Sequence, residues 1–368
     1  MLALSLLACL RPDGLPALPD SVPLACERGL VVPPTGVVGI SDPSLLEPGV
    51  VELVGESRAP WVRAEIHWSL VQPDPDGPLD FSAHDAMMAR IQAQELQVLA
   101  ILSWVPPAYG DDWERIARDF RAFATAAVAR YAPQGVHHWE VFNEPNLTGY
   151  GWLTDADDPY VNLPNYTRLL GIANEVVREV DPEGVVVLGG IASDQHRGLP
   201  LEEVADVLYG YGAADCFDVF AYHPYGYQNR FPEARDRVQA VLDVHDDAEK
   251  PVWFDEYGWT DQASMDLAVN DTAETNPMLA VFAQKDVADA LFWFSAKDYS
   301  GRPGRRPDPG GLRAEQAAEL HDVPASALIR RDPGLVGRWP RRTTPRRRCS
   351  RRSTLSGENC ASSASWPG

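Results

Sequence analysis

Short apolar runs alternate with helix-like segments from residue 37 to residue 296, and this alternation leaves few folds open to the chain. Eight of the runs have the length of a strand and are continuous rather than alternating in polarity, as expected of parallel strands when both faces of their sheet are covered. The predicted strands are residues 37–41, 61–67, 98–103, 138–143, 185–190, 217–223, 251–255 and 290–295.

Helices are predicted between these runs. Residues 113–131 place Ile116, Phe120, Phe123 and Ala127 at spacings of three and four, which is typical of a helix with one buried face. The other predicted helices are residues 84–96, 166–180, 231–245 and 278–287. Eight βα units in about 260 residues predict a (β/α)8 TIM barrel, a parallel α/β fold.

Two further points concern the predicted barrel. The eighth helix should follow residue 295, where the composition changes, so we expect it to be incomplete or irregular. A doubly wound open sheet is the alternative, and the lack of a Gly-rich phosphate loop after the first strand makes it the weaker one.

The two ends of the chain differ from its body. Residues 1–10 are apolar without a preceding basic region, and Leu6-Leu7-Ala8-Cys9 resembles a bacterial lipoprotein cleavage box. We therefore expect residues 1–35 to be a signal segment followed by a Pro-rich tether, and the protein to be secreted or lipid-anchored, with a cytoplasmic chain as the alternative. Residues 36–300 form the predicted barrel domain. Residues 301–368 are rich in Arg and Pro, which predicts a disordered or out-of-frame tail.

The net charge of the chain limits the classes of molecule that it can bind. The chain has a net charge of −21, but residues 299–368 carry 14 Arg and 6 acidic residues, so the rest carries −29. An acidic body of this size is a poor partner for nucleic acid or an anionic membrane and suits a neutral substrate. No run reaches the roughly 20 apolar residues of a membrane span. The five cysteines lack metal-ligand spacing, and Cys216, which precedes a strand, is predicted to be buried. We expect neither a metal nor a cofactor.

Carboxylates follow two strands on nearly opposite sides of the predicted barrel. Glu144 comes after the fourth strand and Glu256 after the seventh, each in an aromatic-rich segment. In such barrels the reacting groups lie at the C-terminal ends of the strands, so the two side chains should face each other across a cleft. Paired carboxylates that flank a bond are the equipment for glycoside hydrolysis.

These motifs resemble clan A of the retaining glycoside hydrolases over roughly residues 36–300. The resemblance rests on Asn143-Glu144-Pro145 after strand four together with Glu256 after strand seven. Residues 102–107 and 143–152 are most similar to family 39. Family 5, the cellulase-like family, is the second choice, because it usually carries a His after strand three, where this chain has Ser103-Trp104.

The resemblance implies roles for the individual residues. Glu144 would be the acid/base and Glu256 the nucleophile. Arg63 would support the nucleophile, Asn143 would bind the sugar 2-hydroxyl, and Tyr225 would donate to Glu256. The remaining residues that we predict to bind substrate are His223, Trp293, Trp104 and Trp68.

The sequence thus predicts a monomeric O-glycoside hydrolase that cleaves a β-linked glycoside, oligosaccharide or polysaccharide by double displacement. For retention, the two carboxyl groups should lie about 5–5.5 Å apart. Two alternatives remain: a carbohydrate-binding barrel without turnover, favoured by the irregular C-terminus, and a transglycosylase that uses the same site.

Overall fold

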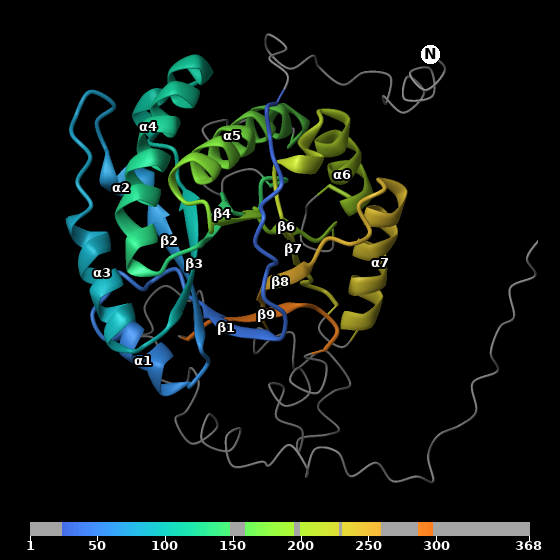
Figure 1. Cartoon of the computed structure of the whole chain (residues 1–368), viewed down its shortest axis with the longest axis horizontal. Helices are drawn as coiled ribbons and strands as arrows, with labels where there is room; N and C mark the ends of the chain where they lie inside the picture. Colours follow the sequence, from blue (N-terminus) through green and yellow to red (C-terminus); the bar gives the residue numbers. More distant parts are fainter. Residues whose placement is uncertain (1–23, 148–158, 195–198, 228–229, 259–285, 297–368) are drawn as a thin grey trace, which may run out of the picture. The chain divides into compact units, whose positions relative to one another are not determined.

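The computed structural model describes residues 24–147, 159–194, 199–227, 230–258 and 286–296 (Figure 1). All of them belong to one compact unit, Met1–Asp322. The predicted signal segment, nearly all of the predicted helix at 278–287, the eighth helix and the tail at 301–368 lie outside the described residues.

Parallel strands form the centre of the molecule. The structure describes β1 (Val37–Ser41), β2 (Trp61–His67), β3 (Gln97–Ser103), β4 (His138–Val141), β5 (Val185–Leu188), β6 (Ile191–Ala192), β7 (Phe220–His223), β8 (Val252–Tyr257) and β9 (Ala290–Phe294). Their order is β5-β4-β3-β2-β1-β9-β8-β7-β6, and every pairing is parallel.

The sheet closes into a barrel through two short strands, β5 and β6, which together occupy the place of the fifth barrel strand. β5 pairs with β4, whereas β6, which follows after Gly189 and Gly190, pairs with β7. A bridge between Val187 and Val219 joins the two ends of the sheet. β5 and β6 therefore act as one barrel strand, and the predicted (β/α)8 barrel is confirmed.

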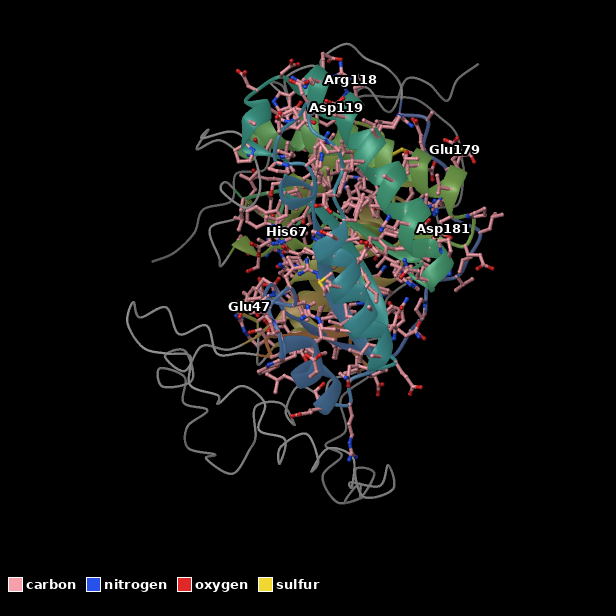
Figure 2. All side chains as sticks on the ribbon, turned by 90° about the vertical axis from the view of Figure 1, so that its left-hand side faces the viewer. Glu47, His67, Arg118, Asp119, Glu179 and Asp181 are labelled. Carbon is pink, nitrogen blue, oxygen red and sulfur yellow. A yellow bond between two sulfur atoms is a disulfide. The ribbon has the colours of Figure 1, made fainter. Side chains whose placement is uncertain are left out.

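Seven α-helices of the described chain lie outside the strands, and Figure 1 shows α1 to α4 on the left, α5 above and α6 and α7 on the right. They are α1 (Val50–Glu56), α2 (Trp68–Val71), α3 (Ser82–Ala93), α4 (Trp113–Tyr131), α5 (Pro159–Val180), α6 (Leu201–Gly210) and α7 (Phe231–Val244). α4 begins where it was predicted, because the side chain of Asp112 caps it by accepting from the backbone N–H of Arg115 at 3.0 Å. Its solvent side carries charged residues such as Arg118 and Asp119 (Figure 2). None of the helices in the described part of the chain has both the length and the apolar character needed to cross a membrane.

Two apolar cores lie inside and outside the barrel wall. The outer core fills the space between strands and helices. The inner one plugs the barrel with side chains from most of its strands, namely Val37, Leu99, Val185, Val187, Val219, Ala221, Trp253, Ala290 and Phe292. Because the interior is filled, a ligand is expected at the ends of the strands.

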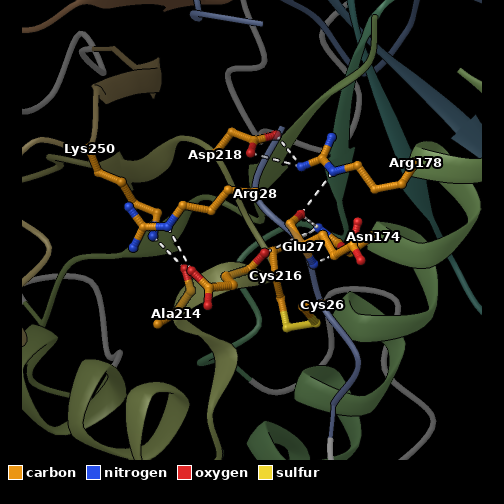
Figure 3. The surroundings of a disulfide bond; sticks show 10 residues. Cys26, Glu27, Arg28, Asn174, Arg178, Ala214, Cys216, Asp218 and Lys250 are labelled. Carbon is orange, nitrogen blue, oxygen red and sulfur yellow. Dashed lines mark hydrogen bonds and ion pairs between the residues drawn. A yellow bond between two sulfur atoms is a disulfide. The ribbon is translucent and has the colours of Figure 1, made fainter. Parts of the chain in front are cut away.

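A disulfide links the N-terminal segment to the residues that precede β7. Cys26 is bonded to Cys216 across 190 residues of sequence (Figure 3). Cys216 is fully buried, as predicted. The disulfide itself was not predicted from the sequence.

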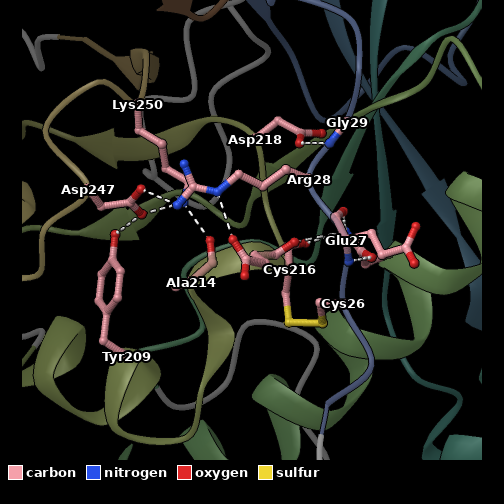
Figure 4. A network of polar contacts seen from close by, with 12 residues as sticks. Cys26, Glu27, Arg28, Gly29, Tyr209, Ala214, Cys216, Asp218, Asp247 and Lys250 are labelled. Atoms are coloured by element: carbon pink, nitrogen blue, oxygen red, sulfur yellow. Dashed lines mark hydrogen bonds and ion pairs between the residues drawn. A yellow bond between two sulfur atoms is a disulfide. The ribbon is translucent and has the colours of Figure 1, made fainter. Parts of the chain in front are cut away.

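Residues 24–30, here called the strap, make further contacts beside the disulfide. The backbone N–H and C=O of Glu27 bond the side-chain amide of Asn174 on α5, both at 3.0 Å. Arg28 contacts Asp215 at 2.7 Å and Asp247 at 2.6 Å (Figure 4). The strap, which lies within the predicted tether of residues 1–35, is thus bound to the barrel through its side chains and backbone.

Candidate active site

Four side chains meet at the C-terminal ends of the strands. Arg63 comes from β2, His223 from the last position of β7 and Glu256 from β8, while Glu144 follows β4. A carboxylate oxygen of Glu144, one of Glu256 and a ring nitrogen of His223 all lie within 4.8 Å of one another. The structure therefore brings the two predicted catalytic carboxylates face to face.

Glu256 accepts from two donors, one on each oxygen. Arg63 Nη1 donates to Oε2 at 2.9 Å, and the Tyr225 hydroxyl donates to Oε1 at 2.8 Å. Burial raises the pKa of Glu256, and the charges of His223 and Arg63 oppose that shift. These contacts hold the carboxylate in one orientation, with its side chain still 13% exposed toward the cleft.

Arg63 is itself held in place by hydrogen bonds to two residues on and just after β4. Its Nε and Nη2 donate to the two oxygens of Glu140 at 2.7 and 2.6 Å, which is a bidentate pair. Nη2 also donates to Asn143 Oδ1 at 2.6 Å. One buried guanidinium thus orients both the predicted nucleophile and the residue that precedes the predicted acid.

Glu144 sits in an unusual backbone conformation. Its φ is +45°, in the left-handed region that non-glycine residues avoid, and its backbone N–H donates to Gly190 C=O at 3.0 Å. Such conformations persist where the surroundings enforce them, and they gather at active sites. The side chain is 3% exposed, and its Oε1 lies 3.0 Å from His223 Nδ1.

His223 lies between two carboxylates. Its Nε2 is 3.4 Å from Asp255 Oδ1, on the side away from Glu144. Burial lowers the pKa of His223, but the charges of Glu256 and Asp255 and the contact with Glu144 outweigh it and raise the pKa to about 10. The ring fits only because residue 190 is glycine, since a Cβ there would lie 2.0 Å from Nε2.

Two fully buried acids were missed at the sequence level. Glu140 on β4 and Asp255 on β8 are both 0% exposed, and Asp255 Oδ2 lies 3.6 Å from Arg63 Nε. Burial and the neighbouring Asp255 raise the pKa of Glu140 to about 8 despite Arg63. The available signal was a carboxylate inside an otherwise apolar strand, which implies a buried cationic partner.

The predicted tryptophans have different surroundings. Trp293 is partly buried and meets Tyr257 edge-to-face at 5.6 Å. Trp104 has φ +64°, and its indole N–H donates to Glu65 Oε2 at 2.7 Å. Trp68 differs from its prediction as a substrate-binding residue, because it is fully buried and stacks on Phe123 of α4 at 5.5 Å. Its position at the start of α2 directs it into the outer core.

Glu144, His223 and Glu256 are also the one group of possible metal ligands within the described residues. Their atoms are already engaged, however, because Arg63 and Tyr225 bind Glu256 while His223 bonds Glu144. A guanidinium 2.9 Å from Glu256 would also repel a bound cation. The arrangement suits proton transfer and nucleophilic attack better than metal binding.

Comparison with known proteins covers most of the barrel. Residues 49–300 match the family model "Cellulase (glycosyl hydrolase family 5)". This is the second of the two families that the sequence suggested. No curated protein shows significant similarity to the chain.

Solved structures share the fold at low sequence identity. A monomeric beta-xylosidase from Caulobacter crescentus CB15 is 17% identical, with a TM-score of 0.58 over 81% of this chain and 70% of that one. A family 39 glycoside hydrolase from Bacteroides cellulosilyticus WH2 is 17% identical, with a TM-score of 0.54 over 78% of this chain and 64% of that one. A glucosidase from Croceicoccus marinus is also 17% identical, with a TM-score of 0.52 over 73% of this chain and 61% of that one. The chain thus spans less than two thirds of the length of the last two.

Proposed function

The chain belongs to the cellulase family, glycosyl hydrolase family 5, and on that premise we propose that it hydrolyses a β-linked O-glycoside with retention of configuration. The observation that carries the proposal is the spacing of Glu144 and Glu256, whose carboxylate oxygens approach within 4.8 Å. Retaining enzymes need carboxyl groups about 5–5.5 Å apart, whereas inverting enzymes leave about 6.5–9.5 Å for a water molecule.

In the first step, a Glu256 oxygen attacks the anomeric carbon. The bond to the leaving oxygen breaks, and Glu144 gives its proton to that oxygen. Arg63 and Tyr225 hold Glu256 with its negative charge directed at the sugar. The product of this step is a glycosyl ester on Glu256 and a free alcohol or sugar.

In the second step, Glu144 takes a proton from water. The water oxygen attacks the anomeric carbon, the ester bond breaks, and Glu256 leaves as a carboxylate. Asn143 accepts from Arg63 through Oδ1, which leaves its amide nitrogen to donate to the sugar 2-hydroxyl. The partly buried Trp293 supplies an indole face for the apolar side of the sugar.

The protein is proposed to work outside the cytoplasm as a monomer. The Cys26–Cys216 disulfide supports export, because such bonds persist in oxidising compartments and are rare in the cytosol. The substrate is a neutral glycoside, oligosaccharide or polysaccharide, and the reaction needs no cofactor.

The test is intact-mass spectrometry after incubation with 2-deoxy-2-fluoro glycosides that carry good leaving groups. β-Xylosyl, β-glucosyl, β-mannosyl and β-galactosyl reagents are compared, each also with Glu256→Gln. The fluorine slows both steps, and the good leaving group lets the glycosyl enzyme accumulate. We expect one adduct on the native chain and none on Glu256→Gln.

The same experiment separates the alternatives. A native chain that binds sugars but never forms an adduct or releases product would be a carbohydrate-binding barrel. A chain that forms the adduct and passes the sugar to a second sugar faster than to water would be a transglycosylase, which product analysis detects. An adduct on a residue other than Glu256 would overturn the assignment of the nucleophile.

A further inference from the structure

Glu65 lies on the inward face of the barrel, one layer nearer the mouth than Arg63. The two residues are two positions apart on β2, so their side chains point to the same face and Glu65 stands about 6–7 Å further along the strand. Arg63 contacts the predicted nucleophile. Glu65 is therefore placed just above the plane where the reacting sugar must sit.

A pocket at this end of the barrel is lined by both Glu65 and Glu256. Ser41, Arg63, Ile101 and Phe294 also line this pocket. Ile101 is the residue on β3 that pairs with Glu65, which confirms that both belong to one layer. A sugar bound against Glu256 would thus come within reach of the Glu65 carboxylate.

Glu65 is anchored through one oxygen only. Trp104 Nε1 donates to Oε2 at 2.7 Å, and His67 Nε2 contacts the same oxygen. The His67 ring stacks on the Trp104 indole with a centroid distance of 5.2 Å and an angle of 6°. Two stacked rings therefore fix the orientation of the carboxylate, which limits the entropy lost when a ligand binds.

The other oxygen, Oε1, accepts no hydrogen bond from the described part of the chain, and the side chain is 14% exposed. Burial acts to raise the pKa of Glu65, but the contacts with His67 and Trp104 and the charge of Arg63 outweigh it and lower the pKa. Glu65 is therefore ionised at neutral pH and presents an acceptor without a donor of its own.

We propose that Glu65 is a specificity-determining residue that accepts a hydrogen bond from a hydroxyl group of an uncharged glycone. The inference rests on the proposed function, because it assumes that the glycone binds beside Glu256. It adds a role that neither the family match nor the two catalytic carboxylates supply.

The charges of the pocket favour an uncharged sugar over a uronic acid. Glu65 and Glu256 both line the pocket, and Arg63, the one cationic side chain among its lining residues in the described part of the chain, is already bonded to Glu140 and Glu256. A sugar carboxylate bound there would be repelled by two negative groups in a partly buried site, and the nearby His223 ring already contacts Glu144. The pocket should therefore reject glucuronides and bind the matching neutral glycosides.

The test combines Glu65→Gln with deoxygenated substrates. Gln keeps the size of the side chain and an acceptor for Trp104 but removes the negative charge. Wild type and variant are assayed on the best aryl glycoside, on its monodeoxy analogues and on the corresponding glucuronide. Glu249→Gln, an exposed carboxylate just before β8, is the matched control.

On the intact glycoside, kcat/KM should fall about 10- to 100-fold in Glu65→Gln, the range for a hydrogen bond to a charged group. On one monodeoxy analogue, wild type and variant should agree within about threefold, because the contacted hydroxyl is then absent. The ratio of glucuronide to neutral binding should rise in the variant. An equal loss on every analogue, or no loss on the intact glycoside, would overturn the role of Glu65.

A binding measurement separates this inference from the proposed function. The neutral sugar is titrated calorimetrically into Glu144→Gln and into the double variant Glu144→Gln/Glu65→Gln, so turnover is not needed. If wild type shows no fluoroglycoside adduct but the double variant binds sugar at least tenfold more weakly, hydrolysis is wrong and the role of Glu65 stands. Equal affinities would refute the role of Glu65 whatever the enzyme does. Absence of binding to either variant by any sugar of the panel would refute both.

Discussion

His223 Nδ1 lies 3.0 Å from Glu144 Oε1, and the other nitrogen of the same ring faces Asp255 at 3.4 Å. A buried imidazole is thus held between the predicted acid/base and a carboxylate that is fully enclosed. Asp255 also lies 3.6 Å from Arg63, which contacts Glu256. The fully buried Asp255 therefore lies beside both His223, which contacts Glu144, and Arg63, which contacts Glu256.

Asp255→Asn should lower kcat/KM and change its pH dependence. The negative charge of Asp255 contributes to raising the pKa of His223 to about 10. Without it, the imidazolium loses its proton at a lower pH, so the basic side of the pH–activity profile should move downward. The control is Asp218→Asn, whose carboxylate pairs with Arg178 ahead of β7, away from the site. A lower kcat/KM without a shift in the basic side of the pH–activity profile would assign Asp255 a purely structural role.

Tyr225→Phe should move the acidic side of the same profile upward. The tyrosine hydroxyl donates to Glu256 Oε1 at 2.8 Å, which favours the ionised form and lowers the pKa of the nucleophile. Loss of this donor raises that pKa, so Glu256 becomes ionised only at higher pH. We expect kcat/KM at neutral pH to fall about 10- to 100-fold, the range for a hydrogen bond to a charged group.

Tyr209→Phe is the matched control for this change. Its hydroxyl donates to a buried carboxylate as well, Asp247 Oδ2 at 2.8 Å, but beside the strap (Figure 4). It should leave the profile unchanged while costing some stability. A similar shift in both variants would mean that the effect does not arise at Glu256.

The barrel could be read from the sequence because its strands are buried on both faces. The predicted strands at 37–41 and 61–67 have the observed bounds, and each ends at a polar residue, Ser41 or His67. Helices α1 and α6 were not identified individually. α1 has seven residues and no side-chain cap at Gly49, and α6 likewise lacks one at Pro200, so both depend on packing more than on local signals.

The candidate site was predictable only in part. Glu144 and Glu256 stand in local motifs at strand ends, where sequence shows them. Glu140 and Asp255 lie in predicted strands, but their contacts with Arg63 depend on the strand register, which the sequence does not give. The Cys26–Cys216 pair depends on how residues 190 positions apart meet in space, which spacing alone does not reveal. Trp68 was misassigned because its neighbours along the chain do not show which face of α2 is buried.

Removing the disulfide should lower stability and leave chemistry intact. The bond closes a loop of 190 residues, and disulfides that close long loops contribute about 2–5 kcal/mol. Cys26→Ser with Cys216→Ser should therefore unfold at lower urea concentration. Because Cys216 precedes β7 while His223 ends it, the site lies at the opposite end of the strand and kcat should stay within about twofold. Wild type treated with reductant should behave like the double variant. Equal urea midpoints for oxidised wild type and the double variant would show that this bond contributes no net stability.

Gly190→Ala should disable the site through a single methyl group. Its Cβ would lie 2.0 Å from His223 Nε2 and 2.9 Å from Asp255 Oδ1, distances at which the ring must move. Displacement of the ring breaks the contact between His223 and Glu144, so we expect kcat/KM to fall at least 100-fold and stability to fall by about 1–3 kcal/mol, as for overpacked sites. Gly210→Ala, at the end of α6, is the control, because its added Cβ would meet no described atom within 4 Å beyond its chain neighbours and the backbone of its own helix. The decisive measurement is single-turnover kinetics on substrates with good and poor leaving groups. The loss should be greater for poor leaving groups, which need the proton from Glu144, and an equal loss for both would contradict a role of His223 in positioning that acid.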